Sequence, residues 1–486
     1  MSVTRSALKK AFLNILPAES ILSSTEELSA YECDGLTAFR RLPLLVLLPE
    51  TVDQVVAVLQ YCDKHHLPVV ARGAGTGLSG GALPFEKGIL LSMARFNRIL
   101  HIDSLARTAR VQPGVTNLAI SNAAAPYGLY YAPDPSSQIA CTIGGNVAEN
   151  SGGVHCLKYG LTVHNVMAVN IVTIEGEQMT LGSAALDAAG YDLLALFNGS
   201  EGMLGVITEV LVKLLPKPQI ARVVMAAFDD VAAAGQAVGE IIAAGIVPAG
   251  LEMMDKLSTA AAEDFVHAGY PLDAEAILLC ESDGTVEEVE AEIAIVEQVL
   301  KKSGAQHMRV SNSEEERQLF WKGRKNAFPA VGRISADYYC MDGTIPRSRL
   351  PEVLRKMMDM SAQYALRCAN VFHAGDGNLH PLILYDANIP GELEKAERFG
   401  ADILELCVAV GGTITGEHGV GVEKIDQMCV QFASAELEQF HAVKDAFDPL
   451  GLLNPGKAVP TLHRCAEFGA MHVHQGQLPH PELERF

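Results

Sequence analysis

The sequence lacks closely spaced cysteines. Its ten cysteines are dispersed from Cys33 to Cys465, and no two of them form a C-x-x-C pair. Pairs of that spacing are typical of zinc ribbons, redox motifs and iron–sulfur centres. We therefore expect free, mostly buried thiols and no cysteine-ligated cluster held by this chain.

The sequence also lacks a dense run of lysine and arginine, and it has no long apolar stretch. Its formal net charge of −21 at pH 7 would repel phosphate backbones and anionic lipid surfaces. Residues 1–17 carry Arg5, Lys9 and Lys10 before an apolar stretch that is too brief for a signal peptide or a membrane span. We expect a cytoplasmic protein with no transmembrane segment and no nucleic-acid partner.

Length and composition indicate a folded protein with more than one domain. The chain has 486 residues, of which 49% are hydrophobic and 20% are charged. One hydrophobic core rarely serves so long a chain. Because the prolines within 216–218 cannot continue a strand or a helix interior, we place a domain boundary there. We expect a helical N-terminal segment (1–37), a first domain (38–216), an α+β second domain (217–412) and a C-terminal segment (413–486).

Hydrophobic periodicity indicates strands and helices in both halves. In the first half we expect strands at 42–49, 67–71, 88–92, 108–112, 166–180 and 204–215, and helices at 52–66 and 115–127. In the second half we expect strands at 223–228, 276–281 and 369–372, and helices at 231–244, 285–302 and 436–447. The region 132–160 is rich in Gly, Pro, Ser and Asn, and so long a connection is usually functional. We expect it to be a structured loop that touches a ligand.

A glycine-rich segment follows the second expected strand. Residues 72–81 read Arg-Gly-Ala-Gly-Thr-Gly-Leu-Ser-Gly-Gly, which matches G-x-G-x-x-G by letter. A Rossmann loop would open a helix here, but Pro84 and Gly88 interrupt the residues that follow. Successive glycines still let backbone N–H groups converge on a phosphate, with Arg72 adding charge or bracing the loop. The predicted phosphate-binding residues are Arg72, Gly73, Ala74, Gly75, Thr76, Gly77, Leu78, Ser79 and Gly80.

Two further segments combine glycines with hydroxyl, amide or carboxylate groups, which suits close contact with a planar cofactor ring. The first contributes Pro133, Asp134, Ser137, Gly144, Gly145, Asn146, Asn150, Gly152 and Gly153. The second, just before an expected strand, contributes Glu201, Gly205 and Ile207. Asn454, near the C-terminus, is a further predicted cofactor contact. The alternative for the glycines before the strand is a simple hairpin or bulge.

Two histidines flank a predicted turn in the second half. His373 follows the strand expected at 369–372, and the Gly-Asp-Gly-Asn sequence after it forces a turn that lets the rings of His373 and His380 converge. Glu417 and His418 lie between glycines further along the chain. Two imidazoles and one carboxylate match the ligand set of a catalytic divalent metal. We expect zinc, with manganese or iron as alternatives.

The three glycine-rich segments together resemble the FAD-binding domain of the vanillyl-alcohol oxidase (PCMH) type, over residues 38–216. The resemblance implies a fold of two subdomains that holds FAD. It places the pyrophosphate on the first loop, and the flavin and adenine portions near Gly144 and Gly205. Members with covalently bound flavin often carry histidine where Thr76 stands, so we expect non-covalent FAD.

The second half resembles the FAD-linked oxidase family of D-lactate, D-2-hydroxyglutarate and glycolate dehydrogenases, through its G-D-G-N-L-H and G-E-H-G-x-G motifs. The resemblance implies a ferredoxin-like cap over the substrate and a C-terminal segment that returns to the flavin. It places the metal on His373, His380 and Glu417. It makes His418 the catalytic base and places Arg324 on the substrate's carboxylate.

Within this family the chain is most similar to the FAD-containing subunits of bacterial glycolate oxidases, a likeness that includes the tail at 461–469. Members of that group act with a second flavin-type subunit and an iron–sulfur subunit. We therefore expect such partners, and a peripheral association with the inner face of the membrane only through them.

The expected activity is metal-assisted hydride transfer from a small D-2-hydroxy acid to FAD, with electrons passed on to a partner or a quinone. Glycolate and D-lactate are the expected substrates, and one methyl group, worth about 1–3 kcal/mol in a pocket, does not rank them. D-2-hydroxyglutarate is an alternative, but Cys340 and Met341 stand where enzymes for that acid tend to carry a lysine. The alternative from another class is a metal-dependent hydrolase or lyase, and a lesser one is a non-redox flavoenzyme.

Overall fold

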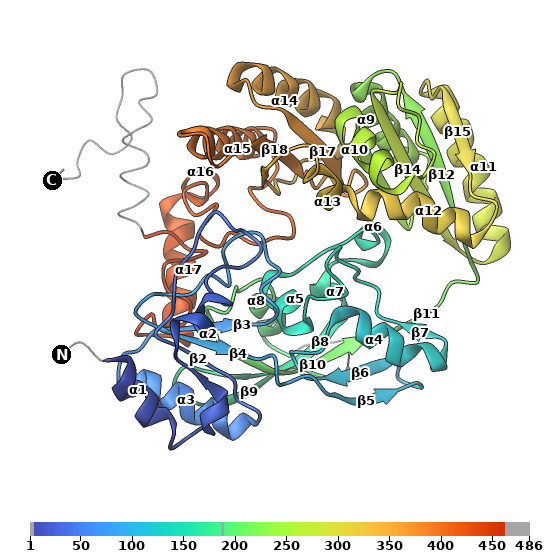
Figure 1. The fold of residues 1–486 in the computed structure, drawn as a ribbon. Helices are drawn as coiled ribbons and strands as arrows, with labels where there is room; N and C mark the ends of the chain where they lie inside the picture. The colour runs from blue at the N-terminus through green and yellow to red at the C-terminus, as the bar shows by residue number, and fades with distance from the viewer. Residues whose placement is uncertain (1–3, 186–188, 462–486) are drawn as a thin grey trace.

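The structure, a computed structural model, describes residues 4–185 and 189–461. Its N-terminal half contains two main sheets, and its C-terminal half contains one larger sheet (Figure 1). The short strands β7 (Leu129–Tyr130) and β11 (Leu215–Pro216) pair just before the chain passes from one half to the other.

A four-stranded sheet lies next to the N-terminus. Its strands, in spatial order, are β1 (Ile21–Leu22), β2 (Leu45–Leu47), β4 (Ile89–Ser92) and β3 (Val69–Arg72). The last three run parallel, so the chain must cross over between β2 and β3. α3 (Val52–Lys64) makes this crossover and begins at a capping box formed by Thr51 and Gln54. The predicted order of strand, helix and strand over 42–71 is confirmed, and the glycine loop follows β3.

A five-stranded antiparallel sheet forms the rest of the N-terminal half. Its strands, in spatial order, are β5 (Ile99–Asp103), β6 (Thr108–Val111), β10 (Val206–Lys213), β8 (Val166–Val172) and β9 (Gln178–Gly182). α5 (Ile143–Glu149) buries Ile143 and Val147 in the core of this sheet. The expectation of a loop throughout 132–160 is therefore wrong in part, because apolar packing folds its middle into a helix. The other helices of this half are α1 (Arg5–Phe12), α2 (Thr25–Ser29), α4 (Asn117–Ala124), α6 (Cys156–Tyr159), α7 (Thr162–Asn165) and α8 (Leu193–Phe197).

A seven-stranded antiparallel sheet organises the C-terminal half. Its strands, in spatial order, are β15 (His307–Val310), β12 (Ile220–Phe228), β14 (Ala276–Gly284), β13 (Gly250–Asp255), β17 (Cys368–Phe372), β18 (Pro381–Tyr385) and β16 (Asp337–Cys340). Residues 223–228 of β12 are all apolar, because both faces of the sheet are covered there. Val224 and Ala226 lie in the core on one face, and Val223 and Met225 lie in the core on the other.

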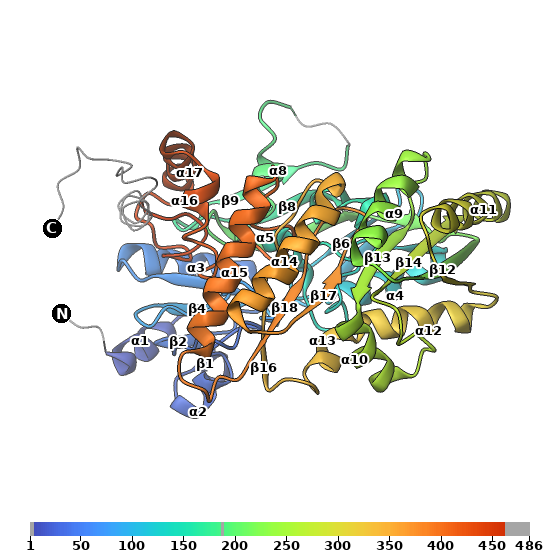
Figure 2. The ribbon, with the colours of Figure 1, turned by 90° about the horizontal axis from the view of Figure 1, so that it is seen from above.

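Two layers of helices cover this sheet. One face carries α9 (Val231–Ala243), α11 (Val286–Lys302), α14 (Leu350–Tyr364) and α15 (Glu392–Ala409), which lie over the strands in Figure 2. The other face carries α10 (Lys256–Val266), α12 (Glu314–Lys325) and α13 (Ala327–Val331). Within the described ranges, no helix combines the length and apolar character needed to cross a membrane.

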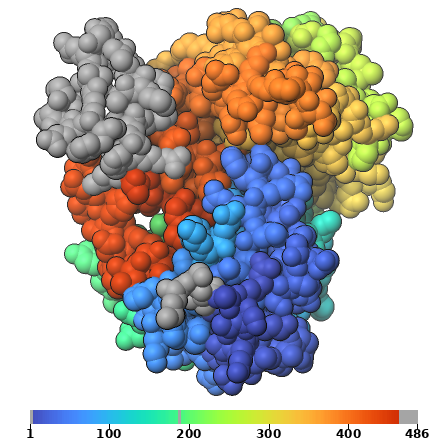
Figure 3. All heavy atoms as spheres, turned by 60° about the vertical axis from the view of Figure 1, so that its left-hand side comes forward, coloured from blue at the N-terminus to red at the C-terminus, as the bar shows by residue number. Residues whose placement is uncertain are grey.

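The C-terminal segment returns to the N-terminal half. After α16 (Met428–Gln431) and α17 (Ser434–Phe447), residues 452–454 run beside β3, with the N–H of Val69 donating to Leu452 O at 2.8 Å. Figure 3 shows this red segment packed between the blue N-terminal residues and the orange cap. The part of the tail at 462–469 that contributed to the family resemblance lies outside the described residues.

The cysteines mostly follow the expectation of free thiols. Eight of them carry free thiols, and six of these eight are buried. Cys429 is disulfide-bonded, so the expectation fails at that position.

A buried ion pair holds the returning segment in place, which gives a stability prediction. Asp448 is fully buried, pairs with Lys444, and accepts the N–H groups of Leu452 (3.0 Å) and Leu453 (2.6 Å). Asp448→Asn would leave the Lys444 ammonium buried without a counter-charge, so we expect it to cost about 3–5 kcal/mol of unfolding free energy.

Thermal unfolding of the purified variant would measure this loss. Asp445→Asn is the matched control, because Asp445 lies on the same helix and is exposed. Equal heat stability of the two variants would contradict the importance of this ion pair.

Candidate active site

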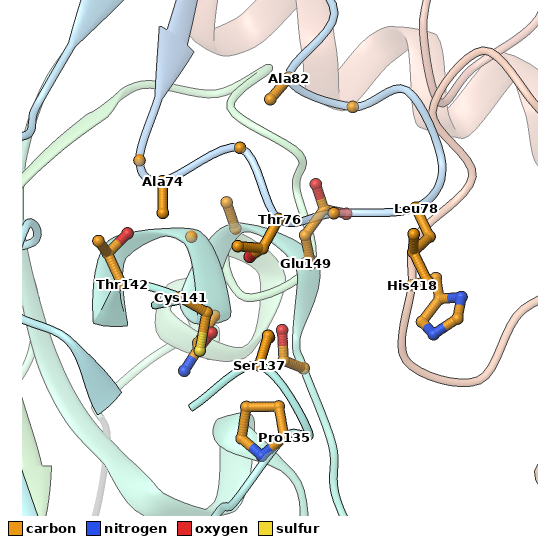
Figure 4. A pocket seen from close by; sticks show the side chains of 18 of the residues that line it. Ala74, Thr76, Leu78, Ala82, Pro135, Ser137, Cys141, Thr142, Glu149 and His418 are labelled. Carbon is orange, nitrogen blue, oxygen red and sulfur yellow. The ribbon is translucent and has the colours of Figure 1, made fainter. Parts of the chain in front are cut away.

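A cavity of about 490 Å³ is lined by residues from both halves of the chain. Its walls comprise the glycine loop after β3, the start of α5, the residues around the start of β10 and the C-terminal end of α12 with α13. The lining also includes His373, His380, Glu417 and His418 from the two histidine motifs. Figure 4 shows part of this lining, with Thr76, Thr142, Glu149 and His418 around one space. A cleft with a few convergent polar groups is the usual form of a small-molecule site.

Most of the predicted phosphate loop lines the cavity. Its lining residues are Arg72, Gly73, Ala74, Gly75, Thr76, Gly77 and Leu78. At Gly77 a Cβ would meet no atom within 4 Å, so this glycine leaves open space beside the loop. No helix starts within 73–88, as predicted.

Arg72 braces the loop. Its guanidinium donates to the carbonyl oxygen of Cys33 at 2.7 Å and lies 5.6 Å from the ring centre of Tyr31. Gly75 has a φ of +71°, and a Cβ there would lie 2.2 Å from the guanidinium. Of the two roles foreseen for Arg72, these contacts favour support of the loop backbone.

Ser79 and Gly80 lie outside the cavity lining, contrary to the prediction. Ser79 is fully buried, and its carbonyl oxygen accepts the N–H groups of Val422 (3.0 Å) and Glu423 (3.1 Å). A Cβ on Gly80 would lie 2.5 Å from the Val422 side chain. These two residues therefore fasten the loop to the C-terminal segment.

The second predicted segment contributes only part of its residues to the cavity. Ser137, Gly144, Gly145 and Asn146 line it, together with Pro135 and Ser136. Gly144 and Gly145 belong to the first turn of α5. A Cβ on Gly144 would lie 2.5 Å from Pro113, so close packing of the helix requires this glycine.

Five residues of the same segment lie outside the lining and have other partners. They are Pro133, Asp134, Asn150, Gly152 and Gly153. Asp134 accepts a hydrogen bond from His155 and lies 3.6 Å from Lys325. Asn150 accepts the N–H of Val163, and the carbonyl of Pro133 accepts from Asn117. A Cβ on Gly152 would meet Glu417, and one on Gly153 would meet the backbone of Asp134.

The third segment lines the cavity as predicted, with Glu201, Gly205 and Ile207. Asn454 lies outside the lining, and its side-chain amide donates to the carbonyl oxygens of Gly81 (2.9 Å) and Glu201 (2.6 Å). The prediction of a direct cofactor contact by Asn454 is therefore not supported, because its donors are used to link two segments of the cavity wall.

The cavity wall also leaves polar atoms without partners among the described residues. Buried Thr142 Oγ1, Asn146 Nδ2 and His418 Nδ1 have no hydrogen bond. Buried polar groups are rarely left unpaired. Together with the open space at Gly77, these atoms fit a bound group that has its own donors and acceptors.

The histidine motifs converge as the sequence predicted. The turn after β17 brings the rings of His373 and His380 to a centroid distance of 5.0 Å. Glu417 Oε1 lies 3.2 Å from His373 Nε2 and 3.3 Å from His380 Nε2. His418 stacks on His380 at 4.8 Å. One atom from each of His373, His380 and Glu417 can therefore meet at a single cation.

A second possible ligand group, Asp342 with His380 and His418, suits a cation less well. Asp342 is fully buried and lies 3.3 Å from the Lys424 ammonium. Its carboxylate also accepts the backbone N–H groups of 416–418. Burial alone would raise the pKa of Asp342, but its neighbours His418 and the Lys424 ammonium hold it well below its usual range. The carboxylate is therefore already neutralised and hydrogen-bonded.

The electrostatics give Glu417 and His418 different roles. Burial alone would raise the pKa of Glu417, but His373 and the neighbouring histidines lower it to about 2. Burial lowers the pKa of His418 to about 4, against the opposing effect of Asp342. Near neutral pH, Glu417 is therefore an anion suited to a cation, and His418 is a neutral imidazole that can accept a proton.

Glu252, on β13, contacts two of the predicted site residues, and the sequence analysis missed it. Its Oε1 lies 2.8 Å from His373 Nδ1, and its Oε2 accepts from Arg324 Nε at 2.8 Å. A carboxylate on the second nitrogen of a metal-binding histidine fixes the orientation of the ring. The signal was a carboxylate in the middle of the largely apolar strand Gly250–Asp255, where burial demands a partner.

Arg324 lines the cavity and is 1% exposed, so it is not a surface charge of its helix. Its guanidinium faces Glu252, with Nη2 at 2.7 Å from the carboxylate. Arg324, Glu252 and His373 thus form a buried chain that leads to the predicted metal ligands.

Both halves of the chain are similar to known FAD proteins. Residues 43–182 match the family model of an FAD binding domain, and residues 217–458 match that of the C-terminal domain of FAD linked oxidases. The chain is 66% identical to glycolate oxidase subunit GlcD of Escherichia coli K12, covering 100% of this chain and 97% of that one. It is 39% identical to the Bacillus subtilis GlcD (93% and 96% covered) and 32% identical to a D-lactate dehydrogenase of Archaeoglobus fulgidus (86% and 92%).

Solved structures with the same fold include p-cresol methylhydroxylase, with a TM-score of 0.80 at 18% identity, covering 94% of this chain and 97% of that one. Alkyldihydroxyacetonephosphate synthase gives a TM-score of 0.73 at 18% identity, with 93% and 86% covered. At such identities the likeness concerns the fold alone. The predicted α+β architecture with a PCMH-type FAD-binding fold is confirmed.

The contact between Glu252 and His373 gives a prediction about cation affinity. We expect Glu252→Gln to weaken zinc binding about 10- to 100-fold, because a neutral amide orients the His373 ring less firmly and makes its other nitrogen less basic. Competition with a colorimetric chelator would measure the affinity. Glu275→Gln is the control, because Glu275 is a half-exposed carboxylate of the same half and pairs with Lys256, away from the histidines. An unchanged zinc affinity would contradict the role of Glu252.

Proposed function

Because the chain belongs to the family of FAD-linked oxidases, we propose that it is an FAD-dependent dehydrogenase of small 2-hydroxy acids, with glycolate as the first candidate substrate and D-lactate as the second. The names of its relatives, glycolate oxidase subunit and D-lactate dehydrogenase, support this substrate class. The observation that carries the proposal is a shared cavity, which the glycine loop and the His373, His380 and Glu417 group both line.

Two groups of residues in the cavity wall would have different tasks: the glycine loop would bind FAD, and the histidine motifs would bind a cation and the substrate. When bound, FAD supplies an acceptor for the hydride that leaves C2 of the hydroxy acid. Residues 73–78 would lie along its pyrophosphate, where bare backbone permits close approach. Thr76 has no imidazole that could form a covalent link, so FAD would be bound non-covalently.

His373, His380 and Glu417 would hold a divalent cation, for which zinc is the first choice and manganese or iron the alternatives. Such a cation supplies charge that lowers the pKa of a bound hydroxyl group. His418, neutral and stacked on His380, would accept the hydroxyl proton. Arg324 would bind the substrate's carboxylate through the edge of its guanidinium that does not face Glu252.

Two alternatives are less well supported. A 2-hydroxyglutarate enzyme needs a partner for a second carboxylate, and the positions expected to supply it hold Cys340 and Met341, both buried. A metal-dependent hydrolase or lyase would use the same histidines but would need no FAD, whereas both family models that match this chain concern FAD proteins.

Partner subunits are part of the proposal. The two GlcD relatives are named as subunits, which implies an assembly. We propose a second flavin-type subunit and an iron–sulfur subunit as the route by which electrons leave. The protein would then act in the cytoplasm and reach the inner face of the membrane only through these partners.

Anaerobic reduction of the bound flavin tests the proposal directly. We expect glycolate or D-lactate to bleach the flavin absorbance of the purified protein, because hydride transfer reduces the ring. Treatment with a strong chelator should abolish the bleaching, and added zinc or manganese should restore it. A colourless protein that takes up no FAD would refute the proposal, and bleaching that survives complete metal removal would refute the metal's role.

His418→Ala tests the proton acceptor. We expect kcat to fall about 10²- to 10⁴-fold, because a general base contributes about that factor. FAD content should stay unchanged, since the glycine loop belongs to another part of the chain. His101→Ala is the control, because His101 is an exposed histidine on β5. Turnover of the His418 variant at the control's rate would exclude this residue as the base.

A further inference from the structure

Glu149 is a carboxyl group in the cavity wall to which neither the motifs nor the proposed chemistry gives a role. It is the last residue of α5 and lines the cavity, and Figure 4 shows it between Thr76 and His418. A Cβ on Gly81 would lie 2.5 Å from its Oε1, and a Cβ on Gly419 would lie 2.1 Å from its Oε2. The carboxyl group therefore fills the space that two glycines leave between the glycine loop and the loop that carries His418.

The neighbour of Glu149 is a second carboxyl group. A Cβ on Gly419 would lie 2.1 Å from Glu149 Oε2 and 3.0 Å from Glu201 Oε1. Both carboxyl oxygens therefore face the same small space beside Gly419. Glu201 accepts the N–H groups of Val420 and Gly421, each at 2.7 Å. Glu149 Oε2 is buried and has no donor among the described residues. The donors that favour a charged carboxylate thus all belong to Glu201.

The nearby cations do not supply the missing donor. The Lys424 ammonium donates to Asp342, to Thr415 and to the carbonyl oxygen of Gly419. The Lys457 ammonium donates to the carbonyl oxygens of Gly81 and Leu83. Asp34, also close to Glu149, adds a further carboxyl group. Burial, and next the charge of Glu201, raise the pKa of Glu149 well above its usual range.

Two adjacent anions in this wall would also lie close to the glycine loop, which is proposed to hold the negatively charged pyrophosphate of FAD. Like charges that share a site in a poorly solvated environment do not both stay ionised, and the group with fewer donors takes the proton. We propose that Glu149 is a positioning residue that stays protonated and donates a hydrogen bond to Glu201, which fastens the His418 loop to the wall of the FAD cavity.

The consequence concerns His418. Gly419, Val420 and Gly421 follow this residue directly, and Glu201 binds the last two through their N–H groups. A proton on Glu149 lets Glu201 keep its charge and both amide hydrogen bonds without repulsion from its neighbour. The carboxyl pair therefore sets the distance between the His418 ring and the glycine loop.

The test compares two substitutions of similar length in the FAD-loaded protein. Glu149→Gln keeps a donor for Glu201 and cannot ionise, whereas Glu149→Met keeps the bulk and removes the donor. We expect the Gln protein to retain kcat close to the wild type, and the Met protein to lose kcat about a hundredfold with little change in KM, because a small misplacement of a reacting group costs about that much. Glu175→Gln, at an exposed carboxylate of the same half, is the control.

A spectroscopic readout does not depend on the reaction. Infrared difference spectra between the wild type and Glu149→Gln should show the carbonyl band of a protonated carboxylic acid near neutral pH, shifted in deuterated water. The control protein should keep this band. The role of His418 rests on the proposed function. An acid band without the difference in kcat between the Gln and Met proteins would therefore count against a positioning role for Glu149. A missing acid band would refute the protonated carboxyl pair, whatever the enzyme's substrate.

Other outcomes also decide the question. A Gln protein as impaired as the Met protein would mean that Glu149 acts as an anion, which overturns the proposal. Equal kcat in the Gln and Met proteins and the wild type would overturn it as well, even if heat stability fell. If the Met protein fails to fold or to bind FAD, the infrared band and the kcat of the Gln protein decide the matter alone.

Discussion

One loop, residues 415–421, is held by two buried carboxylates from opposite halves of the chain. Asp342 accepts the N–H groups of 416–418 from the side of the seven-stranded sheet. Glu201 accepts those of Val420 and Gly421 from the N-terminal half. Hydrogen bonds from backbone amides to charged carboxylates are short and strong, and removing either partner leaves the other buried and unpaired. Glu417 and His418 therefore point into the cavity only when both halves are docked.

This constraint explains why the candidate site lies where the halves meet. The glycine loop follows β3, whereas the histidines follow β17 and precede β18. Neither group forms a site alone, because the cavity needs walls from both. The same docking explains several residues expected to touch a cofactor. Ser79, Gly80 and Asn454 hold the loop, the C-terminal segment and the cavity wall together, and their neighbours line the cavity instead.

The buried carboxylates in this region are balanced by individual positively charged partners and not by an excess of lysine and arginine. The chain carries a net charge of −21, and the site itself contains Glu149, Glu201, Glu252, Asp342 and Glu417. Glu252 is balanced by Arg324, and Asp342 by Lys424. Glu417 has the imidazoles around it, which is the arrangement that a cation can enter. A buried carboxyl group needs either a positively charged partner or a proton of its own.

The sequence by itself determined the elements and the chemical groups. Apolar periodicity located most strands and helices, and the glycines after His373 and around Glu417 indicated turns, because local sterics and burial act over a few residues. Partners were decided only by tertiary structure. No spacing relates Glu252 to His373, Ser79 to Val422 or Glu149 to Glu201, since each pair is brought together by packing between distant segments. A hydrogen bond depends on distances of a few ångströms in space, and these exist only after the halves have docked.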